Sequence, residues 1–210
     1  MTIMMKISAV VVFLLMMISG AGAKSITILA LGDSLTAGYG LAPAEAFPVK
    51  LEAALKASGQ DVVVVNAGVS GDTALDGASR LDWALSDEID AVIVELGAND
   101  ALRGLPPQQA EQAIDDVLAR LKAKGLPVLL AGMRAPPNLG PEYQAGFDGM
   151  YQRLAEKHGA LLYPFFLDGV AADVKLNQAD GLHPNPAGVD IVVARMLPAV
   201  LQLIGSVVKK

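Results

Sequence analysis

The chain has 210 residues, a length that fits one domain or a small pair. Its residues are 53% hydrophobic and 18% charged, a composition that allows a sizeable core and excludes a disordered chain. The absence of cysteine excludes a thiol nucleophile, a disulfide framework, a cysteine-ligated metal and a lipid anchor on cysteine. The net charge of −6, without a Lys/Arg cluster, argues against nucleic acid or an anionic membrane as a partner.

Residues 1–23 have the pattern of a signal peptide. Lys6 is their only charged residue, an apolar stretch of 14 residues follows it, and Ala-Gly-Ala at 21–23 fits a cleavage site. The stretch is shorter than the ~20 residues of a spanning helix, and an uncleaved anchor is the alternative. We expect cleavage before Lys24, a domain at 24–210 with a net charge of −7, no stable membrane anchor after cleavage, and a periplasmic or secreted product.

Downstream of Lys24, short apolar runs alternate with segments of helical spacing. In chain order the runs are SITILAL (25–31), DVVVVNA (61–67), DAVIVELG (90–97), LPVLLAG (126–132) and ALLYPFF (160–166). Helical spacing occurs at 47–59 and 106–125, where Pro107 suits a first turn and Gly59 and Gly125 suit helix ends. A last helix is predicted from Pro186 to about Gly205, with these residues facing inward: Val189, Val192, Val193 and Met196.

Five near-continuous apolar strands with helices between them predict one α/β domain, a parallel sheet covered on both faces. Asp190, Arg195 and Pro198 argue against a membrane span in the last helix. Ligands in such sheets bind beyond the carboxyl ends of the strands. Small and polar residues gather there, in Gly32-Asp33-Ser34 after the first run, AGVSGDT after the second and GAND (97–100) after the third.

The chain has two histidines, and they differ in setting. His158 ends a predicted helix just before a glycine, a position that the helix dipole explains without a function. His183 lies in the turn-rich loop ADGLHPNPAG, three residues after Asp180, a spacing that can orient an imidazole as an acid does beside a catalytic base. A histidine that caps a helix in a surface loop is the alternative for this segment.

A serine nucleophile needs a general base within hydrogen-bond reach. Ser34 is the serine best placed at the expected ligand edge, whereas Ser70 lies in a longer loop flanked by glycine. The alternative for Ser34 is a helix N-cap in an ordinary strand-to-helix turn. Acyl transfer also needs donors for an oxyanion, and a backbone N–H of Gly71 and the side-chain amide of Asn99 are candidates at the same edge.

Other motifs are missing or incomplete. The sequence lacks G-x-S-x-G, a G-x-G-x-x-G after the first strand, and a cluster with metal-ligand spacing, and its closest approach to a phosphate loop falls at the cleavage site. We therefore expect no metal and no cofactor.

The assembled residues resemble the SGNH-hydrolase family, also called GDSL esterases and lipases. Its four blocks occur in order as GDSL (32–35), Gly71 within NAGVSGDT, GAND (97–100) and DGLH (180–183). LGDSLTAGYG and GMRAPPNLGPEY resemble the branch that contains the bacterial arylesterases and the multifunctional thioesterase, protease and lysophospholipase. The resemblance implies a three-layer flavodoxin-like sandwich with Ser34 as nucleophile, His183 as base and Asp180 as its orienting acid. It also implies an oxyanion hole from the N–H groups of Ser34 and Gly71 and the Asn99 side chain.

The function expected from this resemblance is a serine esterase that hydrolyses small-molecule acyl esters, and thioesters, through an acyl-enzyme. The segments 102–107 and 134–144 are expected to border the acyl pocket. A carbohydrate O-deacetylase or an acyltransferase with the same site is the alternative within enzymes. A non-catalytic flavodoxin-like binding module is the alternative outside them.

Overall fold

The computed structural model describes residues 25–207, and the expected signal peptide lies outside them. One sheet of five parallel strands has the order β2-β1-β3-β4-β5, as in flavodoxin-like folds. The predicted five-stranded parallel α/β fold is therefore confirmed. The strands are β1 (Ile26–Gly32), β2 (Val62–Gly68), β3 (Ala91–Glu95), β4 (Val128–Ala131) and β5 (Leu161–Tyr163).

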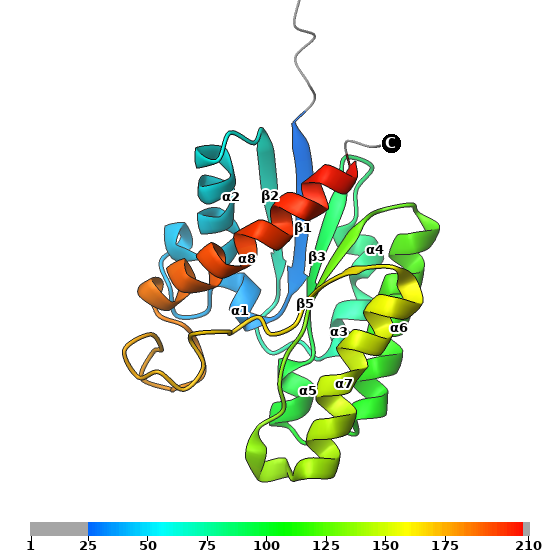
Figure 1. The fold of residues 1–210 in the computed structure, drawn as a ribbon, viewed down its shortest axis with the longest axis vertical. Coiled ribbons are helices and arrows are strands. Elements are labelled where there is room, and N and C mark those ends of the chain that lie inside the picture. Colours follow the sequence, from blue (N-terminus) through cyan, green and yellow to red (C-terminus); the bar gives the residue numbers. More distant parts are fainter. Residues whose placement is uncertain (1–24, 208–210) are drawn as a thin grey trace, which may run out of the picture.

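Helices cover both faces of the sheet (Figure 1). α2 (Phe47–Ala57) and α8 (Pro186–Val207) pack against each other on one face. The other face carries α3 (Ala74–Ser79), α4 (Leu81–Ala84), α6 (Pro107–Ala123) and α7 (Pro141–His158). Short elements complete the chain: α1 (Ser34–Ala37), α5 (Ala98–Leu102), and the 3-10 helices η1 (Pro43–Glu45) and η2 (Pro137–Leu139).

Some predicted boundaries are wrong by two or three residues, for local reasons. β5 ends at Tyr163 because Pro164 has no N–H to donate to a neighbouring strand. β3 ends at Glu95, and Gly97, at φ +111°, then turns the chain into α5. Gly59 and Gly125, at φ +88° and +69°, lie just beyond α2 and α6, where the predicted helix ends called for glycine.

α8 is long and apolar enough to cross a membrane by length and composition, the one such helix among residues 25–207. It packs on α2 and on β3, β4 and β5, as the core helix of an α/β domain does. Its predicted inward residues are all buried, whereas Asp190 is exposed and pairs with Lys50 of α2 at 2.7 Å. The helix therefore closes one layer of the domain, with the loop that contains His183 immediately before it.

Candidate active site

The turn after β1 presents Ser34 at the carboxyl edge of the sheet. Asp33 is the N-cap of α1, and its Oδ1 accepts a hydrogen bond from the N–H of Leu35 at 3.0 Å. Because the capping residue is Asp33, the interpretation of Ser34 as an N-cap is wrong. Gly32 permits the tight turn, since a Cβ there would lie 2.1 Å from Oγ1 of Thr36. The Ser34 hydroxyl is thereby left to face the groups at the open edge.

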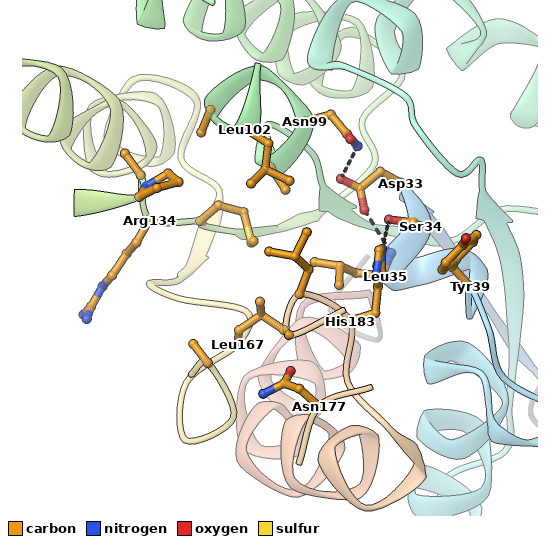
Figure 2. A pocket seen from close by; sticks show the side chains of 18 of the residues that line it. Asp33, Ser34, Leu35, Tyr39, Asn99, Leu102, Arg134, Leu167, Asn177 and His183 are labelled. Carbon is orange, nitrogen blue, oxygen red and sulfur yellow. Dashed lines mark hydrogen bonds between the residues drawn. The ribbon is translucent and has the colours of Figure 1, made fainter. Parts of the chain in front are cut away.

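Ser34, His183 and Asp180 form one hydrogen-bonded series. Ser34 Oγ lies 2.8 Å from His183 Nε2, although 149 positions separate the two residues, and the side chains point toward each other in Figure 2. His183 Nδ1 lies 2.7 Å from Asp180 Oδ2. The structure thus brings together the three residues that the sequence nominated for nucleophile, base and orienting acid, at the spacing that proton transfer requires.

Asp180 is fixed as an ionised acceptor. Its Oδ1 accepts from the N–H groups of His183 and Leu182 at 3.0 and 2.9 Å. These two bonds, together with the contact to the His183 ring, lower the pKa of Asp180 from 3.8 to about 2. A carboxylate that keeps its charge at neutral pH favours the His183 tautomer with the proton on Nδ1, which leaves Nε2 as an acceptor toward Ser34.

Two residues outside the four family blocks hold the histidine loop against the nucleophile loop. Gln178 Nε2 donates to the carbonyls of Tyr39 and Pro184 at 2.8 and 3.0 Å, and its N–H donates to the His183 carbonyl at 2.7 Å. The Tyr39 ring packs on the His183 ring with centroids 4.8 Å apart. Sequence reasoning assigned no role to Gln178 or Tyr39, because no local pattern indicates these contacts.

The backbone N–H groups of Ser34 and Gly71 are both free to donate a hydrogen bond to an oxyanion. Gly71 sits in the loop after β2 at φ +91°, a conformation that glycine adopts readily. Within the described part of the chain, the N–H groups of Ser34 and Gly71 donate no hydrogen bond. Both residues line the same cavity, so these donors fit the role that the sequence interpretation gave them.

Asn99 reaches the same place but with its amide already engaged. Its Nδ2 donates to Asp33 Oδ2 at 3.1 Å and to the Asp72 carbonyl at 2.9 Å, which occupies both N–H bonds of that nitrogen. Asn99 therefore ties the nucleophile turn to the loop of Gly71. For its amide to reach an oxyanion as well, one of these two bonds must be shared or exchanged.

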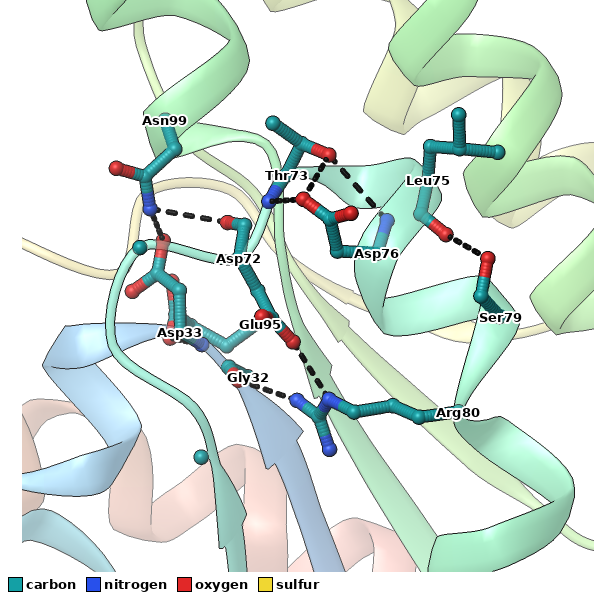
Figure 3. A network of polar contacts seen from close by, with 12 residues as sticks. Gly32, Asp33, Asp72, Thr73, Leu75, Asp76, Ser79, Arg80, Glu95 and Asn99 are labelled. Carbon is teal, nitrogen blue, oxygen red and sulfur yellow. Dashed lines mark hydrogen bonds and ion pairs between the residues drawn. The ribbon is translucent and has the colours of Figure 1, made fainter.

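A polar network underlies the nucleophile turn (Figure 3). Arg80 binds Asp72 through Nε and Oδ2 at 2.5 Å and donates from Nη2 to the Gly32 carbonyl at 2.8 Å. Asp33 is buried without exposed surface, and this burial raises its pKa from 3.8 to about 6. Asp33 and Asp72 lie within the motif blocks GDSL and NAGVSGDT, so the motifs were the available signal for them, whereas no sequence pattern indicated Arg80.

A cavity of about 780 Å³ opens beside Ser34 and His183. Of the two segments expected to border it, Leu102 and residues 134–137 line it, and the remainder of each does not. Arg134 lies at the edge of this groove over the Phe165 ring, 4.8 Å from its centroid. The other walls are mainly apolar: Leu35, Leu102, Met133, Ala135, Pro136, Pro137, Phe165, Leu167 and Leu182.

His158 is the last residue of α7, and its side chain makes a structural contact with α6. Its Nε2 lies 2.6 Å from Asp115 Oδ1 on α6, and Gly159 ends the helix at φ +70°. The structural interpretation of His158 is therefore confirmed. Among residues 25–207, no three His, Asp or Glu side chains gather as a metal site would require.

Comparison with known proteins gives a consistent result. Residues 30–191 match the GDSL-like lipase/acylhydrolase family. The chain is 39% identical to the arylesterase of Vibrio mimicus over 184 residues, which are 87% of this chain and 91% of that one. It is 39% identical to thioesterase 1/protease 1/lysophospholipase L1 of Escherichia coli K12 over 172 residues, 81% of each chain.

A solved structure agrees with these relatives. The crystal structure of AlinE4, an SGNH-hydrolase family esterase, aligns with a TM-score of 0.73 at 48% identity. The alignment covers 86% of this chain and 97% of AlinE4. The match of sequence, of fold and of the four motif blocks leads to one conclusion. The chain belongs to the GDSL-like lipase/acylhydrolase family of SGNH hydrolases.

Proposed function

We propose that the protein is a serine esterase that hydrolyses carboxylic esters, and thioesters, through an acyl-enzyme on Ser34. One observation carries the proposal: Ser34 Oγ, His183 and Asp180 are connected at 2.8 and 2.7 Å. A hydroxyl is a weak nucleophile, and a base held by a third group at these distances activates it.

Acylation begins with the substrate carbonyl carbon above Ser34 Oγ. His183 Nε2 takes the hydroxyl proton as Oγ bonds to that carbon, and the charge of Asp180 stabilises the imidazolium that forms. The carbonyl oxygen gains negative charge and accepts hydrogen bonds from the N–H groups of Ser34 and Gly71. Asn99 adds a third donor when its amide shares one of its present bonds with the oxyanion.

His183 then acts as an acid, and later as a base again toward water. His183 Nε2 gives its proton to the leaving alcohol or thiol as the bond to the acyl carbon breaks. Water then enters, loses a proton to His183 and attacks the acyl carbon, and Ser34 recovers its proton as the carboxylic acid departs.

The groove supports a small-molecule acyl ester as substrate. Its apolar walls suit the hydrocarbon part of an acyl group, since burial of each CH₂ contributes about 0.8 kcal/mol. A carbohydrate O-deacetylase or an acyltransferase would use the same triad. The apolar lining favours the esterase, because a sugar would bring hydroxyl groups to walls with few partners for them.

We also infer that residues 1–23 are removed as a signal peptide and that residues 24–210 act as the hydrolase domain in the periplasm or outside the cell. The charge and cleavage pattern of the leader supports this. N-terminal sequencing of the protein from a periplasmic fraction should give Lys24 as the first residue. An intact Met1 would contradict it.

Hydrolysis of p-nitrophenyl esters, from acetate through palmitate, tests the function. We expect turnover that Ser34→Ala abolishes without loss of folding, and labelling of the wild type, but not of this variant, by a fluorophosphonate probe. The chain length with the highest kcat/KM then reports the depth of the groove. Turnover that persists in Ser34→Ala would refute the acyl-enzyme. No Ser34-dependent turnover and no labelling would favour the binding-module alternative.

A further inference from the structure

A buried glutamate lies directly below the nucleophile turn and has no part in the mechanism described above. Glu95 is the last residue of β3, and in the sheet it is the register partner of Gly32, the last residue of β1. Its side chain has no exposed surface. Figure 3 shows it beside Gly32 and Asp33, beneath the residues that precede Ser34.

The carboxyl of Glu95 holds residues on both sides of Ser34. Its Oε2 accepts a hydrogen bond from Oγ1 of Thr36 at 2.8 Å and a longer one from the N–H of Asp33 at 3.4 Å. The packing around these bonds is tight, since a Cβ on Gly32 would lie 2.7 Å from the same oxygen. One carboxyl oxygen therefore connects the residue before the nucleophile with the residue two positions after it.

The surroundings of Glu95 favour the neutral acid. Its Oε1 is buried without a hydrogen-bond partner, and no cation among residues 25–207 is bonded to the side chain. The neighbouring Asp33 carboxyl has donors of its own in Leu35 and Asn99, so a negative charge is better placed there. The pKa of Glu95 is raised well above its ordinary value, mainly by burial and secondly by the nearby Asp33 carboxyl.

We propose that Glu95 is a positioning residue, present as the neutral acid, that fixes the nucleophile turn by holding Asp33 and Thr36 on either side of Ser34. A fixed turn keeps Ser34 Oγ in line with His183 Nε2 and keeps the Ser34 N–H aimed into the cavity. Glu95 itself does not line the cavity and acts only through these neighbours. The inference rests on the proposed function of Ser34.

The test replaces the side chain in two ways. Glu95→Gln keeps a carbonyl oxygen that can accept both hydrogen bonds and carries no charge. Glu95→Leu removes both bonds at similar volume. Glu88→Leu is the matched control, because Glu88 is exposed in the segment before β3. We would measure kcat and KM on p-nitrophenyl butyrate, the fraction of sites labelled by a fluorophosphonate, and the melting temperature.

We expect kcat per labelled site to fall by about 10- to 100-fold in Glu95→Leu, with KM within about twofold. Glu95→Gln should restore kcat to within about threefold of the wild type, and Glu88→Leu should match the wild type. An unchanged kcat per labelled site in Glu95→Leu would overturn the positioning role, even if the melting temperature falls. A loss in Glu95→Gln as large as in Glu95→Leu would overturn the neutral acid.

A second pair of variants keeps the test decisive if Glu95→Leu does not fold. Thr36→Val removes the hydroxyl that Glu95 Oε2 accepts from, at nearly constant volume, and Thr36→Ser keeps it. We expect kcat to fall by about 3- to 10-fold in Thr36→Val and to stay within about twofold in Thr36→Ser. Equal kcat in the two variants would overturn the inference.

Failure of the proposed function would be seen separately in the wild type. Wild-type turnover that survives Ser34→Ala, or a wild type that no fluorophosphonate labels, would remove the reaction that Glu95 is inferred to support. If turnover depends on Ser34 but the variants of Glu95 and Thr36 keep the wild-type kcat, only the positioning role is overturned.

Discussion

Replacing Asp180 by asparagine should change the proton on His183 while it leaves the surrounding loop in place. The introduced side chain would keep an oxygen that accepts from the N–H groups of Leu182 and His183, as Asp180 Oδ1 does. Its amide nitrogen would then face His183 Nδ1, where the carboxylate oxygen now lies at 2.7 Å. Because an amide N–H donates, Nδ1 must become the acceptor. The proton then moves to Nε2, opposite Ser34 Oγ.

The size of the effect follows from the geometry and exposure of the triad. In a triad whose acid is fully buried, the same replacement lowers kcat by about 10⁴. The side chains of Asp180 and His183 are here 37% and 19% exposed, so water screens part of the lost interaction. We therefore expect kcat to fall by about 10³, which corresponds to about 4 kcal/mol in the activation barrier.

The assay is steady-state hydrolysis of p-nitrophenyl butyrate by the wild type and by Asp180→Asn at one pH, about 7.5. Thermal unfolding of both proteins is the check on folding. KM should change little, because Asp180 does not line the groove. A folded Asp180→Asn protein that keeps more than a tenth of the wild-type kcat would refute the argument that Asp180 selects the tautomer.

Three further predictions follow from the neighbouring contacts. Asn99→Ala should lower kcat by about 10²–10³, and an unchanged kcat would exclude Asn99 from the oxyanion hole. The raised pKa of Asp33, about 6, means that the folded state retains a proton that the unfolded state releases near pH 4. The free energy of unfolding should therefore fall by about 3 kcal/mol from this group as the pH rises from about 4 past 6. Urea titrations should show a smaller fall in Asp33→Asn, and an equal fall would exclude Asp33 as the cause. Gly32→Ala would place a Cβ 2.1 Å from Thr36 Oγ1 and should destabilise the protein by about 1–3 kcal/mol, a loss that an unchanged urea midpoint would contradict.

The amino-acid sequence alone determined the fold class and the order of the residues along the sheet edge. Apolar runs and helical spacing are local properties, so they indicated five strands, the helices between them and the residues that follow each strand. The absence of cysteine and the presence of only two histidines limited the choice of nucleophile and base. The motif blocks then singled out Ser34, Asp180 and His183, which the structure brings within hydrogen-bond distance of one another.

Only the tertiary structure decided how these groups are supported. Thr36 meets Glu95 across 59 positions of sequence, and Arg80 meets the Gly32 carbonyl across 48. The hydrogen bonds of the Asn99 amide to Asp33 and Asp72, and of the Gln178 amide to the Tyr39 carbonyl, likewise join residues far apart in the sequence. Hydrogen bonds tolerate errors of only a few tenths of an ångström. The packing of helices against the sheet sets such distances, and no local pattern in the sequence records them.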